Sequence, residues 1–340
     1  MKWIYKFLIR FFIFTLLFGT FIAISVKFAY VEPSEYIYSD NDWDNFSYTP
    51  EYNHSQWNIL LDAHSHTYYS DGYLSPRQNI LWHISMGFNA MVLTDHNTFD
   101  GVEEILELAR KEFNDTIKVL RGMEWTTDRS HLNIILPPEV SAEDYEKLKT
   151  HSSYSYTPSD EEFKKIIESA HSIGGLVVVN HIPWSEEFCH DQPSREQFLE
   201  WGVDYIEIVN QETYDKISED FCLENNLGII TGTDMHKPEP VYSWTTLNVS
   251  EFSENAIFNE LKAKKTGYIY TGAASPYPVE HKHNPAYSIL YPFIKMGEIF
   301  RDVYSSPYFT EYLTPIFLYP YLVFFSVELS KFVIYRKKRK

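Results

Sequence analysis

Between residues 56 and 275, short apolar runs alternate with longer stretches that have the pattern of helices. Strands that alternate with helices favour parallel pairing through crossover helices. The predicted strands are 57–63, 90–94, 117–120, 132–136, 176–180, 205–209 and 228–231, and the predicted helices are 76–86, 102–113, 160–172, 194–201, 218–225 and 254–264. About seven such units predict an α/β fold with a closed or distorted TIM-like barrel more than an open sheet.

Helix start signals support two of these helices. Ser75 followed by Pro76 suits an N-cap with proline at the first helical position. Ser159 and Glu162 have the spacing of a capping box.

Polar residues lie where the predicted strands end. In barrels of this kind the active-site residues are found at the C-terminal ends of the strands. His64 and His66 follow the first strand, and residues two apart on a strand share a face. Nine residues near these strand ends carry imidazole or carboxylate groups: His64, His66, Asp71, His96, Glu124, His131, His181, Asp234 and His236.

Neutral imidazole and carboxylate are the ligands that zinc, manganese and iron ions share. Nine such side chains exceed the needs of one tetrahedral site and suffice for two or three divalent ions that share a bridging carboxylate. A cluster of this kind makes hydroxide from water near neutral pH and stabilises the oxygens of a phosphoryl displacement. The sequence has no GxGxxG and no GxxxxGK[ST], which disfavours the nucleotide folds that carry them.

These motifs resemble the PHP (polymerase and histidinol phosphatase) superfamily of metal-dependent phosphoesterases. The resemblance covers about residues 58–240 and rests on six motifs in order: His64-x-His66 with Asp71-Gly72, Asp95-His96-Asn97, Gly122-Met123-Glu124, His131-Leu132-Asn133, Asn180-His181 and Asp234-Met235-His236. It implies a distorted (β/α)7 barrel that holds up to three ions.

The resemblance also implies a distribution of ligands. His64, His66, Glu124 and Asp234 would hold the first ion, and Glu124 would bridge to a second ion held also by His131 and His181. Asp71, His96 and His236 would hold a third ion, and Asp71, which is His in some members, favours manganese or iron there. Glu124, His181 and Asp234 are the predicted catalytic residues. Asp62 and Asp95 either orient imidazoles or cap local structure.

The function predicted is a metal-dependent phosphoesterase that hydrolyses a small phosphorylated substrate through a metal-bound hydroxide. Glu124 is followed by Trp-Thr-Thr, which is similar to the CehA/McbA-like branch, where both phosphoesters and other esters are substrates. The alternatives are a carboxyl- or carbamate-ester hydrolase, a 3'-5' exonuclease-like enzyme, and a membrane-tethered binding module with an inactive metal site. A formal net charge of -18 argues against nucleic acid as a partner.

Predicted substrate contacts are Asn97, Arg129 and Lys237, with Arg195 and Asn210 as further candidates. A solvated surface charge is the alternative for each cation. His83 and His171 read as ordinary helix residues, and His281 and His283 read as incidental. Cys189 and Cys222 either form one disulfide or remain thiols.

Both ends of the chain are apolar and aromatic. Residues 1–30 predict an uncleaved transmembrane anchor, with a signal peptide as the alternative, and residues 312–340 predict a second crossing or an interfacial segment with a basic tail. Basic residues precede the first span and acidic residues follow it, so the positive-inside rule puts both termini in the cytoplasm and the catalytic domain on the exported side. Between these segments the sequence predicts a polar linker over 31–55, the hydrolase barrel over 56–275 and a connector over 276–311. Membrane lipid and a small phosphoester are thus the expected partners.

Overall fold

The computed structural model describes residues 2–29, 34–150, 152, 156–276, 280–305 and 309–337, with side chains described for all of these except residues 2, 302–305 and 309–312. The chain divides into two compact units. Residues 36–283 form the barrel unit, and residues 1–35 together with 284–340 form the terminal unit.

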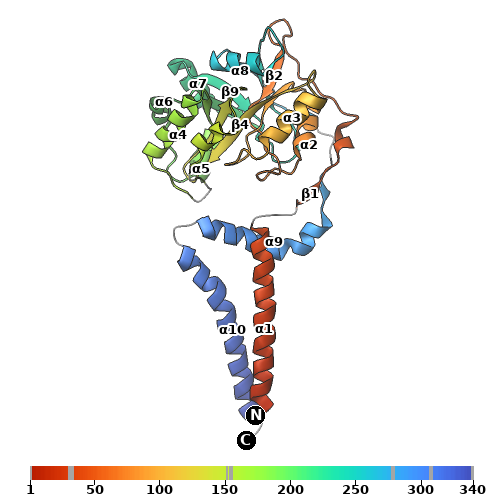
Figure 1. The fold of residues 1–340 in the computed structure, drawn as a ribbon, viewed down its shortest axis with the longest axis vertical. Coiled ribbons are helices and arrows are strands. Elements are labelled where there is room, and N and C mark those ends of the chain that lie inside the picture. Colours follow the sequence, from red (N-terminus) through yellow and green to blue (C-terminus); the bar gives the residue numbers. More distant parts are fainter. Residues whose placement is uncertain are drawn as a thin grey trace. The chain divides into compact units, whose positions relative to one another are not determined.

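The barrel unit is built on a curled, mixed sheet that forms a half-barrel (Figure 1). Its strands run in the order β11-β10-β2-β3-β4-β5-β6-β7-β8, with β9 paired to β7. Their bounds are β2 Ile59–Asp62, β3 Ala90–Val92, β4 Lys118–Thr126, β5 His131–Leu136, β6 Leu176–Val179, β7 Tyr205–Asn210, β8 Thr213–Tyr214, β9 Gly228–Gly232, β10 Ser243–Leu247 and β11 Gly267–Tyr270.

The seven predicted strands are present, but uniformly parallel pairing was wrong. β2, β3 and β4 are parallel, as are β6, β7 and β9, whereas β5 is antiparallel to both β4 and β6. Only residues 127–130 connect β4 to β5, and a connection this short permits a hairpin but no crossover helix. The sequence also missed β10 and β11, which extend the sheet antiparallel beyond β2.

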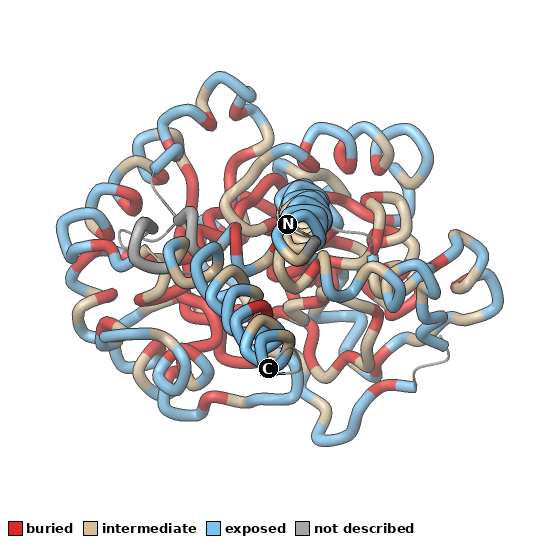
Figure 2. The backbone as a smooth tube through the Cα atoms, turned by 90° about the horizontal axis from the view of Figure 1, so that it is seen from below, coloured by how far each residue is buried: buried red, intermediate tan, exposed pale blue. Residues whose placement is uncertain are grey.

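Helices pack around this sheet: α2 Pro76–Ser85, α3 Val102–Glu112, α4 Asp160–Ser172, α5 Ile182–Phe188, α6 Arg195–Trp201, α7 Lys216–Asn225 and α8 Glu254–Lys262, with the short η2 Asp144–Leu148 after β5. The capping box of Ser159 and Glu162 is present, and Ser75 caps α2 by accepting the Gln78 N–H. In Figure 2 the buried parts of the tube concentrate in the barrel unit, where strands and inner helix faces form the core. Cys189 and Cys222 are free thiols.

Residues 36–55, predicted to be a polar linker, contribute to the core of the barrel unit. β1 Tyr36–Ile37 pairs antiparallel with β12 Lys282–His283, and η1 spans Asp40–Trp43. Tyr38 and Trp43 are buried in one cluster with Trp82 and Trp244.

The terminal unit consists of three helices: α1 Lys2–Phe28, α9 Pro285–Ser305 and α10 Phe309–Lys337. Trp3–Phe28 and Leu313–Lys337 are long and apolar enough to be candidate membrane spans. α10 continues through Pro315 and Pro320, which apolar helices tolerate when neighbouring groups satisfy the backbone. α9 is longer than the short helix predicted near 289–303. The last three basic residues, 338–340, lie outside the described residues.

α1 and α10 pack side by side and antiparallel (Figure 1). Trp3 contacts Phe332 at one end, and Phe18 contacts Phe317 further along, with aromatic contacts between them. Arg10 donates two hydrogen bonds to buried Glu328, from Nε to Oε1 at 2.8 Å and from Nη2 to Oε2 at 2.5 Å. Because the helices are antiparallel, both chain ends lie at the same end of the pair.

We expect Arg10→Leu to weaken the α1–α10 pair by about 1–3 kcal/mol, because it removes the bidentate partner of a buried carboxylate. The double variant Arg10→Leu/Glu328→Leu should recover most of that loss because the buried carboxylate is removed with its partner, and Lys331, which also contacts Glu328 at 2.9 Å, is half-exposed. Cysteines introduced at positions 3 and 332 report the pairing through their cross-linking yield in membranes. Equal cross-linking yields in the wild-type, Arg10→Leu and Arg10→Leu/Glu328→Leu proteins would contradict a role for the ion pair.

Candidate metal centre

The nine residues predicted to bind metal converge at one edge of the half-barrel. His64, His66 and Asp71 follow β2, His96 follows β3, and His181 follows β6. Parallel strands end at this edge, so the loops after them meet there.

His131 reaches the same edge for a different reason. It is the first residue of β5, which runs antiparallel to β4 and so starts where β4 ends. Glu124 lies within β4, and β4 continues two residues beyond it to Thr126, which pairs with His131.

Glu124 lies at the middle of the cluster and is fully buried. Its Oε1 is 3.0 Å from His131 Nδ1 and 3.4 Å from His181 Nε2. Its Oε2 is 3.3 Å from His64 Nε2 and 2.8 Å from His96 Nδ1. His66 Nε2 also lies 3.5 Å from Oε2. The two oxygens of one carboxylate therefore face separate sets of imidazoles, which is the arrangement that a bridging ligand requires.

Asp234 completes a second corner of the cluster, where its Oδ1 lies 3.1 Å from His66 Nε2 and 3.4 Å from His64 Nε2. Donor atoms of these three residues all lie within 4.8 Å of one another, as do those of His64, Glu124 and His181. The structure thus brings together the residues expected around the first and second ions.

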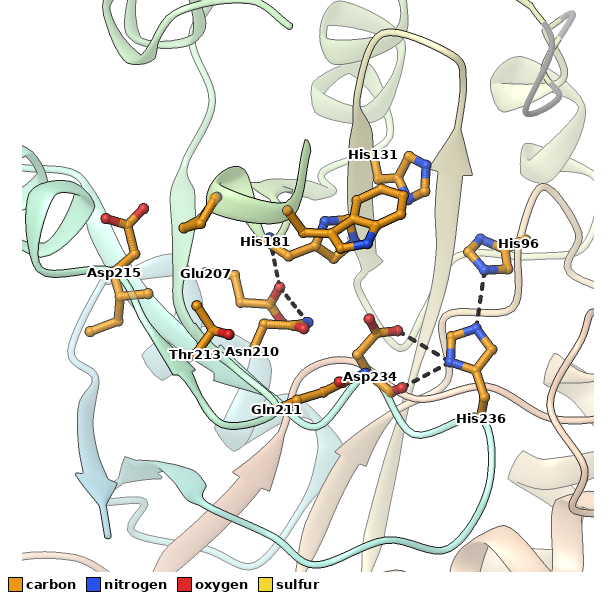
Figure 3. Close-up of a pocket in the computed structure, with 13 residues that line it drawn as sticks. His96, His131, His181, Glu207, Asn210, Gln211, Thr213, Asp215, Asp234 and His236 are labelled. Atoms are coloured by element: carbon orange, nitrogen blue, oxygen red, sulfur yellow. Dashed lines mark hydrogen bonds and ion pairs between the residues drawn. The ribbon is translucent and has the colours of Figure 1, made fainter. Parts of the chain in front are cut away.

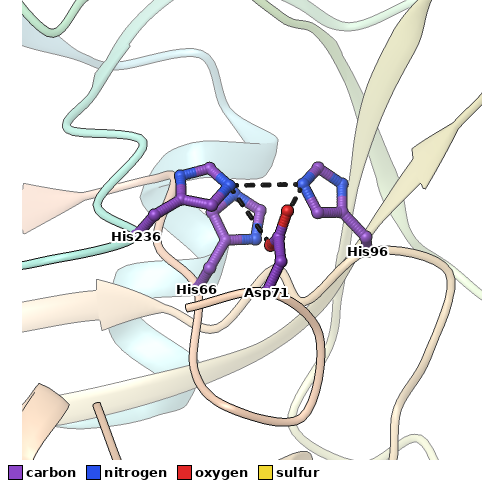
Figure 4. A group of neighbouring side chains, drawn as sticks. All are labelled: His66, Asp71, His96 and His236. Carbon is purple, nitrogen blue, oxygen red and sulfur yellow. Dashed lines mark hydrogen bonds and ion pairs between the residues drawn. The ribbon is translucent and has the colours of Figure 1, made fainter. Parts of the chain in front are cut away.

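The remaining corner contains His66, Asp71, His96 and His236 (Figure 4). Asp71 Oδ1 lies 3.2 Å from His236 Nε2 and 3.5 Å from His96 Nε2. The two imidazole nitrogens face each other at 3.4 Å. Two neutral nitrogen lone pairs at this distance repel unless a proton or a cation lies between them.

The donor atoms fit divalent cations. His64 Nε2 and Glu124 Oε2 are buried, face each other and have no hydrogen-bond partner among the described residues. Asn180 and His131 contact Oε1, whereas a buried carboxylate oxygen without a hydrogen bond is costly, and a cation held by Oε2 and His64 Nε2 removes that cost.

The imidazoles differ in protonation state in the metal-free protein: against the effect of burial, neighbouring carboxylates raise the pKa of His64, His96 and His236. Burial, reinforced by His236 and His96, lowers the pKa of His66 to about 3, which keeps this imidazole neutral and able to bind a metal. Burial opposes the ionisation of Glu124, but His96, His64 and His131 hold the pKa of its carboxyl well below the usual range. Burial likewise opposes protonation of His236, yet the neighbouring carboxylate of Asp71 raises its pKa to about 10.

A pocket of about 300 Å³ opens beside the cluster (Figure 3). Asn210, Gln211, Thr213 and Trp184 line it together with the metal-binding candidates. Its lining contains no lysine or arginine among the residues that the structure describes. Bound cations would therefore be the source of positive charge for an anionic substrate.

Two aspartates expected beside the ligands fix the backbone instead of orienting metal-binding imidazoles. Asp62 accepts the N–H groups of His64 and Thr233, and Asp95 accepts the N–H and hydroxyl of Thr67. Burial raises the pKa of Asp95 to about 6.

The loop that presents Asp71 is closed by Gly72, whose N–H donates to the Thr67 carbonyl. A Cβ at Gly72 would lie 2.7 Å from the His66 carbonyl carbon, so this turn requires glycine.

The predicted substrate contacts are engaged within the protein. The Asn97 side chain pairs with the backbone of Thr126 in both directions. The Arg129 guanidinium is buried against the carbonyls of Pro158 and Asp191.

The other two predicted cations have acidic partners. Lys237 lies 3.1 Å from Glu239, and Arg195 pairs with Asp215 and Glu186. Their roles toward a substrate stay predictions.

Sequence reasoning missed two buried polar residues. His83, read as an ordinary helix residue, is fully buried, and its Nε2 lies 2.9 Å from Asp62 Oδ2. Glu207 is buried in β7, where its carboxylate contacts His64 and His181. The signal that could have revealed it was an acidic residue inside the apolar run Tyr205–Val209.

Comparison with known proteins agrees with this architecture. The PHP domain family model matches residues 62–200. A two-domain protein from Bacteroides vulgatus that contains a predicted PHP-like metal-dependent phosphoesterase shares the fold, with a TM-score of 0.52 and 20% identity over 74% of this chain and 73% of that one. A 5'-3' exoribonuclease from Haemophilus influenzae is 37% identical over 67 residues, which are 20% of this chain and 23% of that protein.

Metal binding to this centre is expected to release protons at neutral pH. Below about pH 10 His236 is protonated in the metal-free protein, and a cation requires the neutral imidazole. Apparent affinity for Mn²⁺ should therefore increase between pH 6.5 and 8.5, by up to about tenfold per pH unit for each proton released. Calorimetric titrations of the full chain in detergent, run in buffers of different ionisation enthalpy, count the protons.

The Asp71→Asn variant provides the matched comparison, because the loss of its charge lowers the pKa of His236. It should release fewer protons per ion bound. Binding heats that do not depend on the buffer would contradict this account.

Proposed function

We propose that this chain is a metal-dependent phosphoesterase that hydrolyses a small phosphorylated substrate at a di- or trinuclear centre. The observation that carries the proposal is the buried Glu124 carboxylate, whose two oxygens face separate sets of imidazoles. The match of residues 62–200 to the PHP domain model supports a metal-dependent hydrolase.

His64, His66, Glu124 and Asp234 would hold one ion, and Glu124, His131 and His181 a second, as the contacts of the Glu124 and Asp234 oxygens with these imidazoles support. Asp71, His96 and His236 would hold a third when it is present. Zinc, manganese or iron bound there supplies activated water and neutralises charge on the phosphoryl oxygens. Glu124, His181 and Asp234 keep their proposed catalytic roles: His181 and Asp234 line the pocket, and the buried Glu124 lies behind them as the proposed bridging ligand.

The protein's own groups bind and orient the rest of the substrate. Asn210, Gln211 and Thr213 offer amide and hydroxyl groups along one side of the pocket (Figure 3). The half-exposed ring of Trp184 lies against the rings of His131 and His181 and limits water access from that side. A substrate with a single phosphoryl group suits a pocket whose positive charge would come only from the ions.

Exonucleolytic cleavage is the second candidate, favoured by the short match to a 5'-3' exoribonuclease. The absence of lysine and arginine from the described pocket lining disfavours a long polyanion. Carboxyl- or carbamate-ester hydrolysis uses the same ions and remains the alternative to test, and the CehA/McbA-like branch stays a prediction.

Membrane anchoring through both terminal helices completes the proposal. The antiparallel pairing of α1 and α10 supports a topology in which both ends of the chain, which are basic, lie on the same side of a bilayer. The positive-inside rule makes that side the cytoplasm, so the barrel unit lies on the exported side and lipid is a partner of the terminal unit.

The activity is tested with the full chain in detergent, after elemental analysis identifies its metals. We expect hydrolysis of 4-nitrophenyl phosphate to exceed that of bis(4-nitrophenyl) phosphate, 4-nitrophenyl acetate and 5'-labelled RNA. Glu124→Ala should lower the metal content, because it removes the ligand common to two ions. It should also lower kcat/KM, by more than about 100-fold.

Glu224→Ala, an exposed acidic position on α7, is the matched control and should retain wild-type activity and metal content. Faster cleavage of the acetate ester or of RNA would move the assignment to the corresponding alternative. Unchanged phosphatase activity in Glu124→Ala or after chelation would overturn the proposal.

Topology is tested separately with epitope tags at both ends of the chain. In intact cells an added protease should digest the barrel unit and leave both tags protected, because the tags lie in the cytoplasm. Digestion of either tag in intact cells would contradict the paired-anchor topology.

A further inference from the structure

Glu207 is an acidic side chain that the proposed ligand sets do not use. It lies in β7, is buried, and belongs to none of the four groups of candidate ligands. A buried carboxylate needs hydrogen-bond donors, and Glu207 has three. Its Oε1 lies 3.1 Å from His64 Nδ1, and its Oε2 accepts the His181 N–H at 2.9 Å and the Asn210 amide at 3.0 Å (Figure 3).

We propose that Glu207 is a positioning residue that holds ligands of two ions at once and thereby couples their binding. This inference rests on the proposed metal-dependent function. In the proposed ligand sets His64 would hold the first ion and His181 the second, and their donor atoms lie within 4.8 Å of each other and of Glu124. One carboxylate thus sets the orientation of a ligand in each set without contacting an ion.

The contact with His64 fixes the tautomer of its ring. A carboxylate at Nδ1 keeps the proton on that nitrogen, which leaves Nε2 with a free lone pair. Nε2 is the nitrogen that faces Glu124 at 3.3 Å and Asp234 at 3.4 Å. The orientation of the ring and the availability of its ligating nitrogen therefore have the same cause.

The contact with His181 fixes a strained stretch of backbone. His181 has φ of 24° and ψ of 55° at the start of α5, a region that residues other than glycine rarely occupy. Its N–H has Glu207 Oε2 as acceptor. This hydrogen bond stabilises the turn that directs the His181 imidazole toward Glu124.

Gly232 provides independent support, because its lack of a side chain makes room for the first contact. A Cβ at this position would lie 2.2 Å from Glu207 Oε1 and 2.4 Å from His64 Cβ. Gly232 is the last residue of β9, which pairs with β7. The close approach of Glu207 to His64 thus requires glycine on the neighbouring strand.

Glutamine is the informative substitution because it keeps the shape and changes one acceptor into a donor. If its NH2 group faces His64, the ring must carry its proton on Nε2, which then cannot bind a metal. If its oxygen faces His64, the NH2 group meets the donors of His181 and Asn210. Each orientation breaks one of the two contacts and keeps the other, so a weakening of both binding steps reports coupling between the two ligand sets.

The test is calorimetric titration of Mn²⁺ into the metal-stripped full chain in detergent, together with thermal melting of the metal-free protein. Glu207→Gln should weaken both binding steps by about 10–100-fold. His131→Ala, which removes a ligand of the second set only, should weaken a single step. Glu224→Gln, an exposed change of the same kind, should leave both steps as in wild type.

Gly232→Ala retains every donor and acceptor and reports the same contact if Glu207→Gln does not fold. It should also weaken both steps. Wild-type affinities in Glu207→Gln, or loss of one step only, would overturn the inference while the proposed function stands. Absence of metal binding by the wild-type protein would overturn the proposed function and this inference together.

Discussion

The burial of the Glu124 carboxylate is the constraint on which the centre depends. An ionised carboxylate inside a protein needs compensating charge or hydrogen-bond donors on each oxygen. Glu124 has Asn180 as a donor at 2.9 Å and imidazoles on both oxygens. Residues from four strands and their loops must each reach this carboxylate. The sheet therefore has to curl so that the ends of these strands converge on Glu124.

The backbone around the centre is correspondingly strained. Of the seven described residues other than glycine that have positive φ, four lie at the centre, in segments that directly follow strands: Asn97, His181, Gln211 and Asp234. Such conformations cost on the order of 1–3 kcal/mol each and persist when surrounding contacts enforce them. The hydrogen bond that the His181 N–H donates to Glu207 and the pairing of the Asn97 side chain with Thr126 are contacts of this kind. Stability and function are therefore coupled in these loops.

Much of the site could be predicted because its ligands occur in short motifs beside strongly apolar strands. The short apolar runs and their alternation with helical patterns predicted the seven strands. Residues such as His64, His66 and His181 follow these strands closely. Glu207 and His83 escaped prediction because nothing in their local sequence distinguishes a buried partner of a ligand from an ordinary residue of a strand or helix. Their roles come from contacts with residues far away in the chain, such as His64 with Glu207 and Asp62 with His83.

The sequence by itself determined the ligand chemistry, the α/β class and the two apolar helices, because these follow from residue type, period and local spacing. Only the tertiary structure decided how the ligands meet. His131 precedes its strand, so in the all-parallel barrel expected from the sequence it would lie at the opposite edge from His64. The antiparallel β5 brings it beside Glu124, because strand direction depends on the short connection and on pairing across the sheet. The same holds for Arg10 and Glu328, which are far apart in the chain and become partners only when α1 and α10 pack together.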